Sequence, residues 1–285
     1  MRSLPKRRVY ETIIFAFLGI ATLVVIVPVG VVTYYLISKG AGALSWEFLS
    51  SAPREGMRAG GIFPAILGTL ILVIGTIIVA LPLGLFAAIY LTEYAKAGPL
   101  IRLIRLTIIN LAGVPSVVFG LFGLGVFVIL CRFGSSILAG SLTLALLILP
   151  LIITASEEAL LAVPWSFREA SLALGVTKWQ TIRHTVLPNA LPGIITGAVL
   201  GIARAAGETA PILFTCAAFF LPRLPHSPFD QVMALPYHLY VICTQVPNVP
   251  IKNQYGTALV LLGLVLCVDL IAIIIRARLR RIRKW

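Results

Sequence analysis

Apolar residues lie in six long runs along the chain, each separated from the next by a shorter segment that carries polar or charged residues. A helix needs about 20 consecutive, mostly apolar residues to cross the hydrocarbon core of a bilayer. Each run reaches that length, so the pattern predicts an all-α membrane protein with six transmembrane helices. The predicted helices lie near residues 12–38, 62–91, 104–131, 137–160, 188–220 and 256–276.

The composition also favours a membrane protein. Of the 285 residues, 59% are hydrophobic and 12% are charged, whereas a soluble domain carries about 25% charged residues. The formal net charge of +13 would also suit a nucleic-acid-binding protein. However, the basic residues cluster at the ends of the apolar runs and do not form a patch with aromatic residues. The sequence therefore predicts membrane lipid as a partner and no nucleic acid.

Lysine and arginine residues are shared unevenly between the two sides of the predicted bundle. Sixteen lie on the side of the two termini and six on the other side, with Arg204 left inside a span. Because cytoplasmic segments are enriched in basic residues, we expect both termini in the cytoplasm and the chain in the inner (plasma) membrane. The first apolar run exceeds the roughly 7–15 residues of a signal-peptide core, so we expect it to remain as a span.

We expect two parts in the chain. Residues 1–60 would hold a basic N-terminal tail, the first transmembrane helix and a periplasmic segment. Residues 61–285 would form a core of five transmembrane helices. Within this core, the segment 164–186 is predicted to be a cytoplasmic loop and the segment 221–255 a periplasmic loop.

The predicted cytoplasmic loop carries helix signals that a simple linker does not need. Ser166 followed by Glu169, and Thr177 followed by Gln180, have the spacing of a capping box. Gly175 suits the left-handed residue that ends a helix, so we expect two short helices joined there. Apolar residues on these helices imply a partner surface, and the alternative is a helical hairpin that packs back on its own bundle. These residues are Leu172, Leu174 and Trp179.

The same loop resembles the coupling loop of the membrane subunits of ABC importers. That pattern is Glu-Ala-Ala, three residues, Gly, nine residues, Ile, one residue and Leu-Pro, and its counterparts here are Glu169, Ala170, Ser171, Gly175, Thr185, Leu187 and Pro188. Ser171 replaces an alanine and Thr185 an isoleucine, both small or β-branched changes on a helix face. The resemblance implies that the loop docks on a separate ATPase subunit and that Pro188 opens the next span. An ATPase site in this chain would need Gly-Lys followed by Ser or Thr, and none of its six lysines follows a glycine.

The fifth apolar run combines small residues with a charge pair. Gly193, Gly197 and Gly201 recur every four residues, a spacing that lets another helix approach closely. Arg204 and Glu208 are also four apart and therefore share a helix face. A charge at the bilayer centre costs at least about 2.5–3.5 kcal/mol, and pairing offsets only part of this cost.

Two interpretations of the pair remain open. In the first, the pair is a fixed structural contact that sets the register of the helix. In the second, Arg204 meets an anion in a transport pathway, because its planar guanidinium can donate two parallel hydrogen bonds to an oxyanion. Glu208 would then orient Arg204, or hold it once the anion has left. Pro211 favours the second interpretation, since it cannot donate to the carbonyl of Gly207 and should bend the helix beside the pair.

The stretch 204–214, RAAGETAPILF, resembles the signature of phosphate permeases, a family of type I ABC importers. The stretches 60–69, 90–94 and 253–262 resemble the same family, and the last of them, together with Ala210 and Pro211 after Thr209, points to its A-type subunit. The resemblance implies the type I importer permease fold, inorganic phosphate as the substrate, and Arg204, Glu208 and Thr209 along its pathway. It also implies a heterodimer with a C-type permease subunit, two ATPase subunits that hold ATP and Mg, and a periplasmic or lipid-anchored phosphate-binding protein.

Other functions have less support in the sequence. A permease for another oxyanion, such as molybdate or sulfate, would share the loop but not the signature at 204–214. An ion-driven secondary transporter would show an inverted repeat with two interrupted spans, and the sequence shows no such repeat. A membrane-embedded enzyme would need His, Asp or Cys clustered near one face, and the three histidines lack metal-ligand spacing. We therefore expect no catalytic residue, metal or cofactor in this chain.

Overall fold

The computed structural model describes residues 4–282, so Arg2 of the predicted basic tail lies outside the described residues. The long helices are α1 (Leu4–Gly40), α3 (Phe63–Ile89), α6 (Ile137–Leu161), α9 (Leu187–Gly207) and α12 (Ile251–Ile282). The shorter helices are α2 (Trp46–Ser50), α4 (Pro99–Ala112), α5 (Ser116–Gly123), α7 (Trp165–Ala173), α8 (Lys178–Thr181), α10 (Ala210–Thr215) and α11 (Leu235–Thr244).

Short turns and one hairpin connect these helices. The 3-10 turns are η1 (Ala41–Ala43) and η2 (Glu55–Met57), and the π turns are η3 (Tyr90–Tyr94), η4 (Leu124–Leu130) and η5 (Ile182–Val186). Strands β1 (Pro53–Arg54) and β2 (Ala59–Gly60) form an antiparallel pair, in which Pro53 lies opposite Gly60. In the described part of the chain, five helices are long and apolar enough to cross a membrane, or six if a bent helix pair counts as one span.

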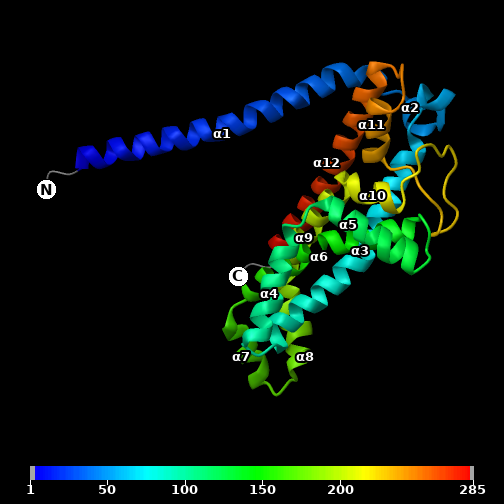
Figure 1. Cartoon of the computed structure of the whole chain (residues 1–285). Coiled ribbons are helices and arrows are strands. Elements are labelled where there is room, and N and C mark those ends of the chain that lie inside the picture. Colours follow the sequence, from blue (N-terminus) through cyan, green and yellow to red (C-terminus); the bar gives the residue numbers. More distant parts are fainter. Residues whose placement is uncertain (1–3, 283–285) are drawn as a thin grey trace.

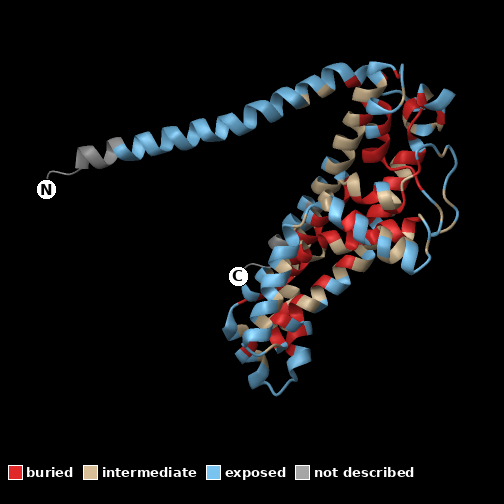
Figure 2. Cartoon of the chain, viewed as in Figure 1, coloured by how far each residue is buried: buried red, intermediate tan, exposed pale blue. Residues whose placement is uncertain are grey.

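The helices form an elongated bundle whose two ends differ (Figure 1). α7 and α8 lie at one end, and α2 and α11 lie at the other. α1 projects away from the bundle and meets α12 near Gly40, where Tyr35 and Tyr255 pack edge to face with ring centroids 5.7 Å apart. Buried residues gather where α3, α6 and α9 pack and around α11, whereas residues 10–39 of α1 are almost all exposed (Figure 2).

The third predicted span, 104–131, is wrong as one continuous helix. The chain forms α4 and α5 here, bent by 102° at a break of three residues. Pro115 lacks a backbone N–H and disfavours helical geometry at Val114, so the helix stops at Ala112 and restarts at Ser116.

The fifth predicted span, 188–220, is wrong at both ends. It begins at Lys178, because η5 joins α8 to α9 in one 30-residue helix, so Pro188 does not open a separate helix. It ends at Gly207, where Glu208 takes an extended conformation with ψ 132°, and the chain restarts only as the short helix α10. Pro211 lies in the first turn of α10, where its missing N–H removes no helical bond.

The segment after α10 folds back into the bundle. Val232, Met233 and Leu235 are almost fully buried and pack in the main apolar cluster with Leu72 of α3 and Ile212 of α10. The chain also passes very close to α3. The backbone N–H of Leu235 donates to Oγ1 of Thr69 at 2.8 Å, and a Cβ added to Gly68 would lie 1.9 Å from the carbonyl oxygen of Met233.

This contact generates a stability prediction. We expect Gly68→Ala to destabilise the protein by about 1–3 kcal/mol, because the added methyl group must push aside backbone atoms of a well-packed segment. Thermal unfolding of the purified protein in detergent measures the effect as a lower midpoint. Gly263→Ala in α12 is the matched control, since a Cβ there would meet nothing within 4 Å. Equal midpoints for the two variants would contradict the close packing.

Candidate functional site: an interrupted helix and an exposed helical loop

Arg204 and Glu208 form an ion pair where α9 ends. Nε of Arg204 lies 3.5 Å from Oε1 of Glu208, and the two side chains are 36% and 16% exposed. A charge-assisted hydrogen bond between such groups is usually about 2.7–2.9 Å long, so this contact is loose. Among the described residues, this is the one hydrogen bond that the Arg204 guanidinium makes. The remaining donors of Arg204 are therefore available to another acceptor.

Glu208 borders a small cavity inside the bundle. The cavity measures about 10 Å³, room for about one water molecule. Its walls come from α3, α6, α9, α10 and the start of α11, and they include Thr69, Leu72, Leu144, Ile212 and Pro236. The pair thus lies between a narrow interior cavity on the Glu208 side and the outer surface of the chain on the Arg204 side.

The small residues of α9 decide which way Arg204 faces. A Cβ added to Gly193 would lie 2.6 Å from Cβ of Ala159, and one added to Gly197 would lie 2.4 Å from Cβ of Ala155. Gly201 lies against Ile148 and Ile152, which belong to α6, as do Ala155 and Ala159. The glycine face of α9 is therefore turned to α6, and Arg204 lies beside this seam and remains partly exposed.

Thr209 and Pro211 lie at the break next to the pair. Thr209 is half-buried, and its carbonyl accepts the backbone N–H of Leu213 at 3.1 Å. The other interrupted span packs directly here, because a Cβ added to Gly120 of α5 would come within 2.9 Å of Cα of Pro211. Non-helical backbone at membrane depth is tolerated only inside protein or beside water. The break after α9 lies beside the cavity that Glu208 borders, whereas the pocket beside the break after α4 is lined by apolar residues such as Val114 and Phe119.

The loop at the α7–α8 end has the geometry of two short helices. Gly175 connects them with φ +78°, in the left-handed region that glycine adopts without strain. Thr177 and Gln180 form the predicted capping box: the hydroxyl of Thr177 accepts the Gln180 N–H at 3.3 Å, and the Gln180 side chain accepts the Thr177 N–H at 2.8 Å. The other predicted capping box is wrong. Pro164 holds the N-cap position of α7, which places Ser166 inside the first turn, too late to cap it.

The residues of the Glu-Ala-Ser triplet divide between solvent and the loop interior. Glu169 and Ala170 are exposed. Ser171 points inward, where its Oγ lies 3.0 Å from Oγ1 of Thr181 and accepts from Thr185 at 3.4 Å. The rest of the loop exposes large apolar side chains, which an isolated soluble surface rarely gathers in one place. They are Trp165, Leu172, Leu174 and Trp179.

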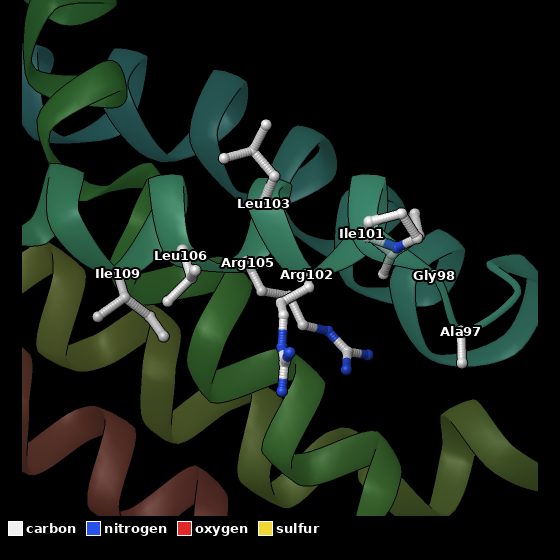
Figure 3. Close-up of a pocket in the computed structure, with 9 residues that line it drawn as sticks. Ala97, Gly98, Ile101, Arg102, Leu103, Arg105, Leu106 and Ile109 are labelled. Atoms are coloured by element: carbon white, nitrogen blue, oxygen red, sulfur yellow. The ribbon is translucent and has the colours of Figure 1, made fainter.

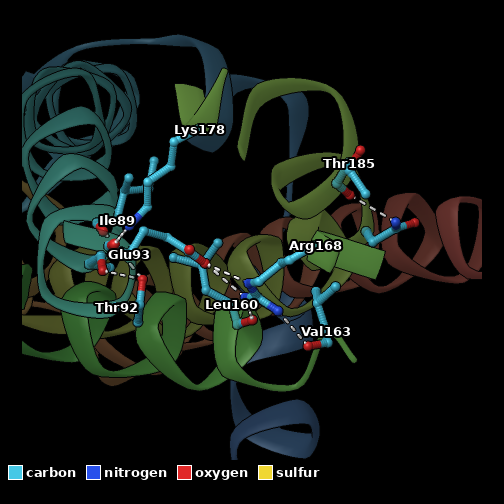
Figure 4. A network of polar contacts seen from close by, with 10 residues as sticks. Ile89, Thr92, Glu93, Leu160, Val163, Arg168, Lys178 and Thr185 are labelled. Atoms are coloured by element: carbon cyan, nitrogen blue, oxygen red, sulfur yellow. Dashed lines mark hydrogen bonds and ion pairs between the residues drawn. The ribbon is translucent and has the colours of Figure 1, made fainter. Parts of the chain in front are cut away.

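A buried ion pair behind this loop was not predicted. Nε and Nη2 of Arg168 donate to Oε1 of Glu93 at 3.0 and 2.8 Å, and the two side chains are 6% and 5% exposed (Figure 4). Arg168 also donates to the carbonyls of Val163 and Leu160 at 2.7 and 2.9 Å. Removing one partner of such a buried pair typically costs about 3–5 kcal/mol. The two residues lie 75 positions apart, and no local spacing relates them.

Lys178 completes this network. Its Nζ donates to the backbone carbonyl of Glu93 and lies 5.0 Å from the centre of the Tyr94 ring. The guanidinium of Arg168 in turn lies 5.2 Å from the centre of the Trp165 ring. Both loop helices are thus held to η3, the π turn that ends α3.

A groove of about 810 Å³ runs along α4 (Figure 3). Its lining is mostly apolar, and Arg102 and Arg105 extend from α4 on one side of it. Nη2 of Arg105 pairs with Glu157 of α6 at 2.7 Å and donates to the carbonyl of Leu91 at 3.1 Å. This third ion pair therefore fastens α4 to α6, and the bond to Leu91 fastens it to η3 at the end of α3. The described residues contain no group of three His, Cys, Asp or Glu that could hold a metal ion.

Residues 80–281 match the family model of the binding-protein-dependent transport system inner membrane component. The chain belongs to this family. Among named relatives, the phosphate transport system permease protein PstA 1 of Mycobacterium tuberculosis (strain CDC 1551 / Oshkosh) is 36% identical over 276 residues, which cover 95% of this chain and 90% of the relative. The probable ABC transporter permease protein YqgI of Bacillus subtilis (strain 168) is 31% identical over 273 residues, covering 90% of this chain and 92% of the relative.

Solved structures show the same fold. The similarity to a chain of a bacterial ABC transporter involved in the import of the acidic polysaccharide alginate covers 99% of this chain and 100% of that chain, with a TM-score of 0.67 and 13% identity. The MetNI methionine ABC transporter in an inward-facing conformation matches 77% of this chain and 94% of its own, with a TM-score of 0.57 and 19% identity. The predicted fold class, the permease of a type I ABC importer, is confirmed.

An ion-driven secondary transporter was expected to show an inverted repeat with two interrupted spans. Among the described residues, one pair of apolar helices forms a broken span, at residues 113–115. A broken span therefore also occurs in an ABC importer permease, and its second helix, α5, packs against α10 through Gly120 and Pro211.

The loop geometry of the permease generates a second prediction. We expect Gly175→Val to destabilise the loop by about 1–2 kcal/mol, because at φ +78° the Cβ atom of a side chain comes too close to the following carbonyl oxygen. Gly175→Asn should have a smaller effect, because asparagine adopts the left-handed conformation more readily than valine. Proteolytic cleavage of purified protein between residues 174 and 178 should accelerate in the order Gly, Asn, Val. Gly42→Ala is the control, since that position has open space and an ordinary φ. Equal cleavage rates for the valine variant and the original protein would contradict the prediction.

Proposed function

We propose that this chain is the phosphate-conducting transmembrane subunit of an ATP-driven importer in the inner (plasma) membrane, with both termini in the cytoplasm. The relatives named as phosphate permeases support the substrate, since their similarity extends over nearly the whole chain. One observation of this structure carries the mechanism: a partly exposed arginine with free donors stands where the span Lys178–Gly207 ends. The excess of basic residues on the side of the termini supports the orientation.

The importer would contain further subunits. We propose that a C-type permease forms a heterodimer with this chain, that two ATPase subunits bind ATP and Mg, and that a periplasmic or lipid-anchored protein delivers phosphate. This chain would then have no catalytic residue of its own. The exposed apolar surface on α7 and α8 supports ATPase docking there, around Glu169, Ala170 and Gly175. Residues 1–60 would form the accessory N-terminal part and residues 61–285 the permease core.

Phosphate recognition follows from the chemistry of the pair. A phosphate oxyanion accepts two parallel hydrogen bonds from a guanidinium, and Arg204 holds Glu208 through a single long contact. The carboxylate of Glu208 repels phosphate and would retain Arg204 when the pathway is empty. The Thr209 hydroxyl, directly after Glu208, would supply an uncharged donor.

Coupling to the ATPase has a direct mechanical route. α8, η5 and α9 form one helix from Lys178 to Gly207, which contains 30 residues and is therefore about 45 Å long at 1.5 Å per residue. A displacement of the loop would reach Arg204 through this continuous helix. The bundle would then alternate the side to which the pair is open.

A permease for molybdate or sulfate is the second candidate. Both are tetrahedral oxyanions that a guanidinium could hold in the same way, and the coupling loop would serve either. Competition between phosphate and these anions during transport distinguishes the two candidates.

The proposal generates a third prediction. Removing the anion contact in Arg204→Ala should lower phosphate uptake by about 10- to 100-fold, because a hydrogen bond to a charged group contributes about 1.5–3 kcal/mol. Arg204→Lys keeps the charge but loses the planar guanidinium, so its phosphate uptake should lie between that of the original protein and that of Arg204→Ala. Uptake of labelled phosphate into proteoliposomes that contain the whole importer measures both variants.

Lys252→Ala, on the exposed first turn of α12, is the control and should transport normally. If Arg204→Ala and Glu208→Ala were both present at normal levels in the membrane and imported phosphate at the original rate, the pathway role would be wrong. Inhibition of uptake by molybdate or sulfate at concentrations equal to phosphate would favour the second candidate.

A further inference from the structure

α3 connects the exposed loop to the cavity beside Glu208. Together with η3 it forms a helix of 32 residues from Phe63 to Tyr94. Near its first turns, Thr69, Leu72 and Val73 line the cavity that Glu208 borders. At its other end, the side chain of Glu93 holds the loop through Arg168. One helix therefore contacts both functional regions of the permease.

The contact at Glu93 joins several elements at a single point. Arg168 of α7 reaches Glu93 through two nitrogens and also binds the carbonyls of Leu160 and Val163, where α6 ends. Lys178 of α8 binds the carbonyl of the same glutamate. Figure 4 shows Arg168 reaching the side chain of Glu93 and Lys178 approaching the backbone of Glu93 from another direction. The ends of α3 and α6 and the two loop helices meet here.

The chemistry of this contact suits the transmission of a defined movement. An apolar contact allows sliding, whereas the guanidinium of Arg168 binds Glu93 through Nε and Nη2 and the carbonyl of Val163 through Nη1. It therefore fixes α7 against both the end of α3 and the end of α6. Both side chains are nearly inaccessible to solvent, so water cannot replace one partner when the loop is pulled. The link should therefore hold while the loop moves.

We propose that Glu93 and Arg168 are positioning residues that join α3 to the coupling loop, so that α3 and the α8–α9 helix move as one body. This inference deepens the proposed function and rests on it. α9 carries loop displacement to Arg204, and α3 carries the same displacement to the cavity wall next to Glu208. Both sides of the ion pair then respond together. Without the link, the loop would still dock on its ATPase, but of this network only the contact of Lys178 with the Glu93 carbonyl would hold α3 to the loop, so α3 would follow less closely.

The test separates ATP hydrolysis from transport in the reconstituted importer. Glu93→Gln keeps the shape of the side chain and removes its charge, and Arg168→Gln removes the guanidinium group. For each variant we would measure ATPase co-purification, ATP hydrolysis and phosphate import. We expect normal co-purification, ATP hydrolysis within about twofold of the original, and at least a tenfold fall in phosphate imported per ATP. The double variant Glu93→Gln/Arg168→Gln should be no worse than either single variant, because both remove the same link.

Glu158→Gln is the matched control, since Glu158 lies exposed on the last turns of α6 and outside the network. A merely structural pair predicts a different pattern, in which hydrolysis and import fall in parallel or co-purification is lost. That pattern, or an unchanged import-to-hydrolysis ratio, would overturn the inference. If Arg168→Gln fails to assemble, Arg168→Lys takes its place in the test. Its ratio of phosphate imported to ATP hydrolysed should fall as well, because lysine lacks the guanidinium group. Failure of the original importer to take up phosphate would instead refute the proposed function.

Discussion

Polar groups inside a bilayer must find partners within the protein, and the arrangement of this chain depends on that constraint. Water is absent from hydrocarbon, so an unsatisfied backbone group or a lone charge there is costly. In the permease, α5 and α10 follow the breaks at residues 113–115 and 208–209 and pack against each other through Gly120 and Pro211. Arg204 and Glu208 pair at the second break. The Glu93–Arg168 and Arg105–Glu157 pairs lie at or beside η3, so the charged groups of all three pairs find partners within the chain.

The two ends of the bundle are connected by unbroken helices, whereas its middle contains the breaks. α3 and the α8–α9 helix both run from the loop network to the walls of the Glu208 cavity. α6 holds them together, since the glycines of α9 lie against Ala155 and Ala159, and Gly84 of α3 lies against Ile152. This combination of rigid connections and a local opening is what a conformational switch between two access states requires.

Much of the fold could be predicted from the sequence because membrane helices are encoded by local apolar runs, and Gly175 and the Thr177 capping box encode the loop locally as well. The breaks were missed since Pro115 and Pro211 are compatible with either a bend or an interruption, and neighbouring helices decide between them. The Glu93–Arg168 pair could not be predicted, because its partners lie 75 residues apart. The one available signal was a lone acidic residue at the end of an apolar run.

The π turn η5 sets the angular phase between the exposed loop and the ion pair. A π turn holds one more residue than the α-helix around it, and each residue of an α-helix rotates the chain by about 100°. Because the wider turn at Ile182–Val186 absorbs that extra residue, the glycine face of α9 stays on α6 while α7 and α8 are seated on η3. Deleting one residue from η5 would restore an ordinary helical turn with Gly197 still against Ala155, whereas deleting one residue from the α-helical stretch between η5 and Gly193 would rotate Arg204 by about 100° relative to the loop.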